Sequence, residues 1–197
     1  MKYVPNTLTI TRILVTPVLL VLLFSDTLTG YAWAFGLFVF ASISDHYDGK
    51  LARRYEVESS FGKYLDPLAD KVLVLGTFIV LIFVLPELVP IWAVSLIALR
   101  DIAVTGLRSW VRRTKNRSLR TIRIAKAKTT VQLTYLIGTL LLLTLSRIPG
   151  AIGHQATAIL GGDFLYWLLI VVALVTVATG IVYFVKVNEL LDDDVNE

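Results

Sequence analysis

The stretch SDHYDGKLARRYEVESSFGKYLDPLADK, residues 44–71, decides how the rest of the chain is interpreted. Its four aspartates and two glycines recur at helical spacings, in a chain that is otherwise rich in apolar residues. At about 100° per residue, each half of the stretch gathers two aspartates and one glycine on a single helix face. The first face holds Asp45, Asp48, Gly49 and Ala52, and the second holds Ser59, Gly62, Asp66 and Asp70. Two such faces, one on each side of a short break, predict a metal site between two helices.

The composition is that of an integral membrane protein. Of the 197 residues, 56% are hydrophobic and 17% are charged, whereas a soluble domain has about 45–50% apolar and about 25% charged residues. The apolar residues form runs long enough to cross a bilayer, which takes about 20 residues each. We therefore expect one all-α domain of six transmembrane helices over residues 1–186, followed by an acidic cytoplasmic tail at 187–197. The helices are expected at about residues 7–24, 30–54, 60–84, 88–112, 126–147 and 162–186.

The basic residues predict which side of the membrane each connection faces. Connections on one side hold Lys2, Arg53, Arg54, Lys186 and the run 112–128, which has eight lysines or arginines and no acid. The opposite connections, at 25–29, 85–87 and 148–161, hold none. The positive-inside rule then places both termini in the cytoplasm of a multi-pass cell-membrane protein. Beside membrane spans, such a basic run faces anionic lipid head groups, so no nucleic-acid partner is expected.

Four aspartates inside a membrane need compensating charge. One aspartate at mid-membrane costs about 2.5–3.5 kcal/mol on insertion scales, and mutual repulsion adds to this cost. The chain has no cysteine, which excludes thiolate ligands and nucleophiles. An all-carboxylate set suits two Mg²⁺ or Mn²⁺ ions, and such a pair commonly bridges a phosphate or diphosphate. A proton or ion pathway is the alternative use of intramembrane carboxylates.

The spacing of the aspartate stretch resembles that of the CDP-alcohol phosphotransferase family, whose signature is DxxDGxxARx8GxxxDxxxD. The sequence matches this signature at every position from Asp45 to Asp70. Further pieces are similar to the phosphatidylglycerophosphate synthase branch of the family. These pieces are PNTLTITR at 5–12, LRD at 99–101, GLR at 106–108 and AKAKTT at 125–130.

The resemblance implies a six-helix fold, a homodimer and a polar cavity that opens to the cytosol. It also implies transfer of the phosphatidyl group of CDP-diacylglycerol to glycerol 3-phosphate, which gives phosphatidylglycerol phosphate and CMP. The family's metal ligands match Asp45, Asp48, Asp66 and Asp70, and its general base matches Asp70. Its contacts to the CDP group match Asn6, Thr9, Gly49, Arg53 and Ser59. Asn6 has an alternative role as the cap of the first helix.

A small phosphorylated acceptor needs fixed cations. Arg100 and Arg108 fall in the fourth expected helix, and Lys126 and Lys128 open the fifth. A cation inside a membrane span is a functional candidate by default, so we expect these four residues to bind the acceptor phosphate. An ion pair between Arg100 and Asp101 is the structural alternative.

Two other functions stay open at this point. A sibling transferase would use another acceptor, such as inositol phosphate, serine, or phosphatidylglycerol as in cardiolipin synthesis. The cationic residues argue against serine, whereas inositol phosphate would satisfy them equally. A divalent-ion or proton transporter would reuse the aspartates, but it would have no special need for Gly49 or Gly62.

Overall fold

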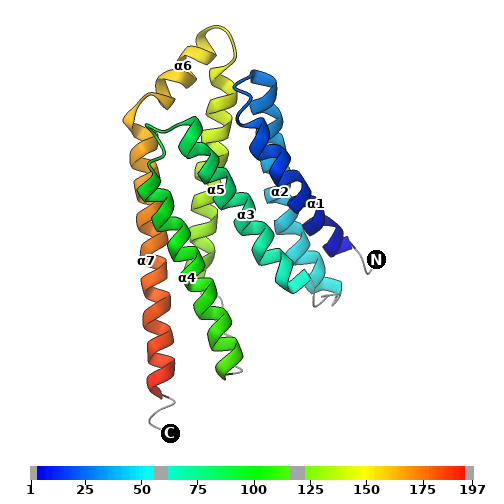
Figure 1. The fold of residues 1–197 in the computed structure, drawn as a ribbon, viewed down its shortest axis with the longest axis vertical. Helices are drawn as coiled ribbons and strands as arrows, with labels where there is room; N and C mark the ends of the chain where they lie inside the picture. The colour runs from blue at the N-terminus through cyan, green and yellow to red at the C-terminus, as the bar shows by residue number, and fades with distance from the viewer. Residues whose placement is uncertain (1–3, 56–61, 116–122, 194–197) are drawn as a thin grey trace.

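The computed structural model describes residues 4–55, 62–115 and 123–193, which form seven α-helices and no strand. This confirms the all-helical fold class. Figure 1 shows the arrangement of the helices. Their bounds are Val4–Leu22 (α1), Leu28–Tyr55 (α2), Gly62–Val84 (α3), Ile91–Lys115 (α4), Arg123–Ser146 (α5), Ala151–Leu160 (α6) and Asp163–Asp193 (α7).

Helix α5 lies between two groups of helices. It contacts α2 and α3 on one side and α7 on the other. Within the groups, α1 packs on α2 and α3, and α4 packs mainly on α7. The short helix α6 lies across one end of the bundle, while both chain ends lie away from it (Figure 1). The carboxyl ends of α2 and α4 and the amino ends of α3 and α5 are therefore all at the end opposite α6.

One apolar core joins the helices. Phe38 of α2, Phe78 of α3, Leu136 of α5 and Leu169 of α7 are each fully buried within it. The rings of Phe78 and Tyr135 stack, with their centroids 5.9 Å apart. Because these side chains come from four different helices, the core fixes the two groups relative to each other.

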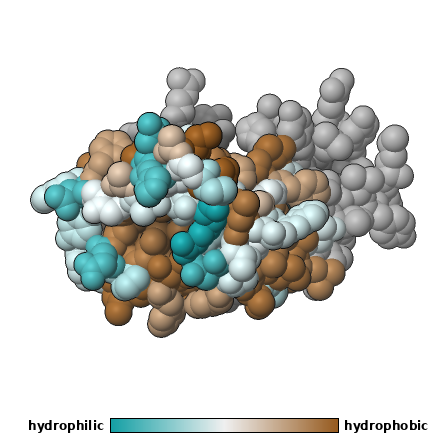
Figure 2. All heavy atoms as spheres, turned by 90° about the horizontal axis from the view of Figure 1, so that it is seen from above, coloured by the Kyte–Doolittle hydropathy of each residue, from teal (hydrophilic) through white to brown (hydrophobic). Residues whose placement is uncertain are grey.

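Large apolar side chains also cover the outside of the bundle. Phe83 of α3, Leu99 of α4 and Trp167 of α7 are each more than 60% exposed. Seen from the α6 end, hydrophilic side chains lie on the end face, with hydrophobic atoms around them (Figure 2). Among the described residues, Lys128–Ser146 and Asp163–Val185 are long and apolar enough to cross a bilayer. The expectation of six spans stays a prediction.

Two bounds differ from those expected. Residues 151–160 form α6, although the whole segment 148–161 was expected to be a connection. Gly150, the residue directly before α6, has a φ of 99°. A Cβ at Gly153 would lie 1.9 Å from the Ile148 carbonyl oxygen. Glycine is therefore required at both places. In addition, α7 continues to Asp193, well beyond the expected end of the span at residue 186.

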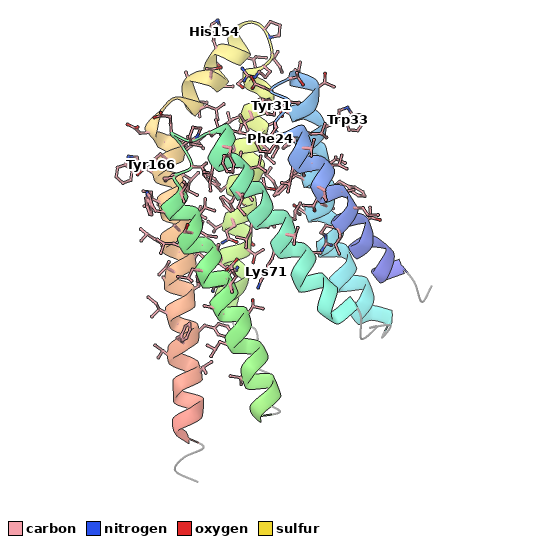
Figure 3. All side chains as sticks on the ribbon, viewed as in Figure 1. Phe24, Tyr31, Trp33, Lys71, His154 and Tyr166 are labelled. Carbon is pink, nitrogen blue, oxygen red and sulfur yellow. The ribbon has the colours of Figure 1, made fainter. Side chains whose placement is uncertain are left out.

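A polar contact closes the bundle at the α6 end. Asp26, in the turn between α1 and α2, accepts a 2.8 Å hydrogen bond from the Tyr31 hydroxyl. Arg147, just after α5, forms an ion pair with the same carboxylate oxygen and lies over the Tyr31 ring. Figure 3 shows Tyr31 near this end of the bundle. The α1–α2 turn is thereby tied to the end of α5.

Candidate active site

The aspartate stretch occupies the facing ends of α2 and α3. Asp45, Asp48, Gly49 and Arg53 lie in the last turns of α2, and Asp66 and Asp70 lie in the first turns of α3. Only residues 56–61 join the two helices, so Tyr55 and Gly62 lie at most about 25 Å apart. The side chains of these aspartates, of Arg53 and all of Ser59 lie outside the described residues. That the aspartates of α2 and those of α3 face each other therefore stays a prediction.

The chemistry of this donor set fits a hard divalent ion. Four carboxylates supply only oxygen ligands, which suit Mg²⁺ or Mn²⁺ rather than a soft metal. The side chains that the structure describes contain no group of three metal-ligating residues of their own. The aspartates of α2 and α3 are thus the candidate metal ligands.

Helix α1 runs antiparallel to α2 beside the aspartates. Arg12 of α1 is only 2% exposed, and it lies beside Phe40, Ala41 and Ser44 of α2. Because both helices rise 1.5 Å per residue, this register brings Thr9 to the level of Asp45. It likewise brings Asn6 to the level of Asp48 and Gly49. The side chains of Asn6 and Thr9 are not described, so their contact with a nucleotide stays a prediction.

A second cluster, which we call the cation cluster, consists of Lys71, Arg100, Asp101 and Lys128. Asp101 of α4 is 5% exposed. Its Oδ1 accepts a 3.0 Å hydrogen bond from Nη1 of Arg100 and a further bond from Nζ of Lys128 on α5. The ion pair between Arg100 and Asp101 is thus confirmed. Lys128, by joining it, links α4 to α5.

Lys71 joins the cation cluster from α3. Its Nζ donates a hydrogen bond of 3.2 Å to the Asp101 carbonyl oxygen and another to the Thr105 hydroxyl. In Figure 3, the Lys71 side chain extends from α3 toward α4 and α5. Lys71 directly follows Asp70 and is the last residue of the aspartate stretch, so the cation cluster and the stretch share this residue.

Helix α7 holds Arg100 from the other side. Nη2 of Arg100 donates a 3.0 Å hydrogen bond to the Thr179 hydroxyl. A Cβ at the neighbouring Gly180 would lie 2.8 Å from Cγ of Arg100, so the arginine stem packs directly on the α7 backbone. One turn further along, Gln132 of α5 donates a 3.2 Å hydrogen bond to Thr176. Arg100 is therefore a packed and paired residue, and its side chain is only 9% exposed.

The structure brings together two of the four cations expected to bind the acceptor, Arg100 and Lys128. Arg108 lies in α4 and Lys126 in α5, but their side chains lie outside the described residues. Sequence reasoning gave no acceptor role to Lys71 or Asp101. The only signal in the sequence was an acidic residue next to Arg100 in an apolar helix. This signal does not reveal that Lys71 and Lys128 contact Asp101 from two other helices.

The charges of the cation cluster suit a phosphate ester. Arg100 and Lys128 both bind the Asp101 carboxylate, and Lys71 binds the carbonyl oxygen of the same residue. A phosphate monoester carries a charge of about −1.5 to −2 at neutral pH, opposite in sign to that of these three cations.

Comparisons with known proteins find a matching family and similar chains. The family model of the CDP-alcohol phosphatidyltransferases matches residues 2–182. A protein of Rickettsia typhi, named CDP-diacylglycerol–glycerol-3-phosphate 3-phosphatidyltransferase, is 35% identical over 184 residues, which cover 93% of this chain and 96% of that protein. A protein of Bacillus subtilis with the same name is 38% identical over 116 residues, 53% of this chain and 59% of its own length. A chloroplastic and mitochondrial protein of Arabidopsis thaliana, also so named, is 32% identical over 144 residues, 67% of this chain and 48% of its own length.

Proposed function

Because the chain belongs to the CDP-alcohol phosphatidyltransferase family, we propose that it transfers the phosphatidyl group of CDP-diacylglycerol to glycerol 3-phosphate. The products are phosphatidylglycerol phosphate and CMP, and the reaction serves phospholipid biosynthesis. The observation that carries this proposal is the match to the Rickettsia typhi protein, whose name states the reaction and which aligns over nearly all of both chains.

Asp45, Asp48, Asp66 and Asp70 are assigned as the ligands of two divalent ions, Mg²⁺ or Mn²⁺. When bound, the ions supply positive charge that neutralises the diphosphate and the departing CMP. Support comes from the oxygen-only donor set and from the place of the four residues at the joined ends of α2 and α3.

Asp70 is assigned as the general base. Its carboxylate accepts the proton of the C1 hydroxyl of glycerol 3-phosphate. That hydroxyl oxygen forms a bond to the phosphorus that carries the diacylglycerol, while the bond from this phosphorus to the CMP oxygen breaks. CMP leaves with the electron pair of that bond. Asp70 and Lys71 are consecutive in α3, so the backbone of the assigned base adjoins a residue of the cation cluster.

The CDP group is assigned to Asn6, Thr9, Gly49, Arg53 and Ser59. The register of α1 against α2 supports this set, because it brings Asn6 and Thr9 to the level of the aspartates. Gly49 lets a ligand approach the α2 backbone, and the Arg53 guanidinium suits a phosphate oxygen.

The acceptor phosphate is assigned to Lys128, together with Arg108, Lys126 and Arg100. The contacts of the cation cluster support Lys128 most directly, since its side chain is 15% exposed against 9% for Arg100. Arg100 contributes charge to this site while it packs on α7.

The proposed setting is a cell membrane crossed by α1 to α5 and α7, with both termini and the aspartates on the cytoplasmic side. The basic run 112–128 then meets anionic lipid, and α6 lies on the outer side. Two chains form the proposed homodimer.

The test is CMP release by the purified protein in detergent, with CDP-diacylglycerol and either Mg²⁺ or Mn²⁺. Glycerol 3-phosphate, inositol phosphate, serine and phosphatidylglycerol are offered in parallel. We expect release with glycerol 3-phosphate alone, reduced about 10²–10⁴-fold in Asp70→Asn. Release with inositol phosphate instead would assign the chain to a sibling reaction, which the charge of the cation cluster also suits. A folded, metal-loaded protein that releases no CMP with any acceptor would favour the transporter alternative.

A further inference from the structure

Asp101 is the centre of the cation cluster. Its carboxylate oxygen accepts hydrogen bonds from Arg100 and Lys128, and its carbonyl oxygen accepts one from Lys71. Through this one residue, α4 is connected to α5 and to the helix that carries Asp70. A carboxylate at such a place costs desolvation energy, which its bonds to Arg100 and Lys128 offset.

In the cation cluster, Arg100 is packed against α7, whereas Lys128 is more exposed. Arg100 is held by the Thr179 hydroxyl and by its packing against Gly180, so it fixes one edge of the Asp101 carboxylate. Lys128 binds the same oxygen and is the more exposed of the two cations. A lysine is a flexible chain with a point charge at its end, and it takes a fixed position only when a partner holds it.

We propose that Asp101 is a positioning residue for the acceptor phosphate: held by Arg100, its carboxylate keeps the Lys128 ammonium in the place where the dianion binds. This inference rests on the proposed function. It adds an acidic residue, Asp101, to a site that binds an anionic ligand. The carboxylate itself does not touch the substrate; it acts through Lys128.

The direction in which Asp101→Asn changes the affinity for the acceptor distinguishes this proposal from a purely electrostatic role of Asp101. Asp101→Asn removes one negative charge and leaves the shape of the side chain nearly unchanged. If only the local field mattered, an anionic acceptor would bind more tightly to the variant, because the net charge of the cluster would rise. If Asp101 positions Lys128, the acceptor binds more weakly, because the charge-assisted bond that holds the lysine is lost.

The experiment measures KM for glycerol 3-phosphate, KM for CDP-diacylglycerol and kcat of the wild type, Asp101→Asn and Asp101→Glu. We expect Asp101→Asn to raise KM for glycerol 3-phosphate about tenfold, with KM for CDP-diacylglycerol unchanged. Asp101→Glu keeps the charge and should recover part of the loss. Asp26→Asn is the matched control: Asp26 also pairs with an arginine, but at the α6 end of the bundle, so all three constants should stay at the wild-type values.

Two results would overturn the proposal. One is an unchanged or lowered KM for glycerol 3-phosphate in Asp101→Asn. The other is a parallel change of both KM values and of the melting temperature, which would show a structural role only.

Failure of the proposed function has a different signature, since the wild type itself would then not use glycerol 3-phosphate. In that case, binding of glycerol 3-phosphate and of inorganic phosphate to wild type and Asp101→Asn is measured by titration calorimetry. Weaker binding to the variant supports the positioning role independently of the reaction. Equal binding, or no binding to the wild type, excludes it.

Discussion

At the scale of single residues, the Asp26 carboxylate gives the fold a predictable response to pH. The hydrogen bond from Tyr31, and then the partnership with Arg147, hold the pKa of Asp26 below its ordinary value of 3.8. A carboxyl whose pKa is lower in the folded state stabilises the fold above its unfolded pKa, and this contribution disappears as the pH falls through the folded pKa.

We therefore expect Asp26→Asn to lower stability slightly at neutral pH, by about 0.2–1 kcal/mol as for other exposed ion pairs. The difference between wild type and variant should shrink from about pH 4 downward. Melting temperatures in detergent between pH 3 and pH 7 measure it, with Arg147→Gln as the second single variant of a double-mutant cycle. A difference that stays constant over this range would show that the charge of Asp26 is not involved.

Single residues also show how far the sequence could predict the candidate site. The charged positions were visible, because an ionisable residue in an apolar helix is conspicuous. The partners were not visible, because Asp101 and Lys128 are 27 positions apart and Asp101 and Lys71 are 30 apart. Only the packing of α3, α4 and α5 brings them together. The acceptor role of Arg100 stays a prediction, and its contacts to Asp101 and Thr179 show that it also connects α4 to α7.

At the scale of helices, the contact between α4 and α7 depends on Gly180, because glycine has no Cβ to keep Arg100 away from the α7 backbone. A Cβ there would lie 2.8 Å from Cγ and 3.2 Å from Nε of Arg100, so Gly180→Ala must displace the arginine. We expect the variant to raise KM for glycerol 3-phosphate and to lower the melting temperature by about 2–4 °C for each kcal/mol lost. Steady-state kinetics and thermal unfolding in detergent measure the two effects.

Gly36→Ala on α2 is the matched control for this contact, since nothing lies within 4 Å of a Cβ at Gly36. Alanine in an open helical position is more favourable than glycine by roughly 0.5–1 kcal/mol. The control should therefore melt at the wild-type temperature or above it. If Gly180→Ala behaves in the same way, Arg100 does not depend on its packing against α7.

The helices also show why the elements were only partly predictable. The long apolar runs predicted both ends of α1 to α5 within about three residues, and the start of α7 within one. Helix α6 was missed, since its ten residues are too few for a span and lie between Pro149-Gly150 and Gly161-Gly162, which indicate turns. The change to acidic residues near position 187 predicts where the apolar surface ends, but a helix does not stop there, and α7 continues to Asp193.

At the scale of the whole molecule, the orientation in the membrane is open to a direct test. Helix α5 runs from Arg123 to Ser146 and leads into α6, so α6 lies at the opposite end of the bundle from Arg123. The positive-inside rule places the basic run in the cytoplasm. The uncharged helix α6 must then lie on the outer side of the same membrane.

Because the chain has no cysteine, single cysteines report this orientation without background. Gln155→Cys places a thiol on an exposed position of α6, and Ser118→Cys places one in the basic run. With a membrane-impermeant maleimide on spheroplasts, we expect Gln155→Cys to react at once and Ser118→Cys to react only after permeabilisation. CMP release by each variant confirms that it is folded. The reverse pattern would place the aspartates and the cation cluster on the outer side, away from cytosolic glycerol 3-phosphate, and would contradict the proposed reaction together with the topology.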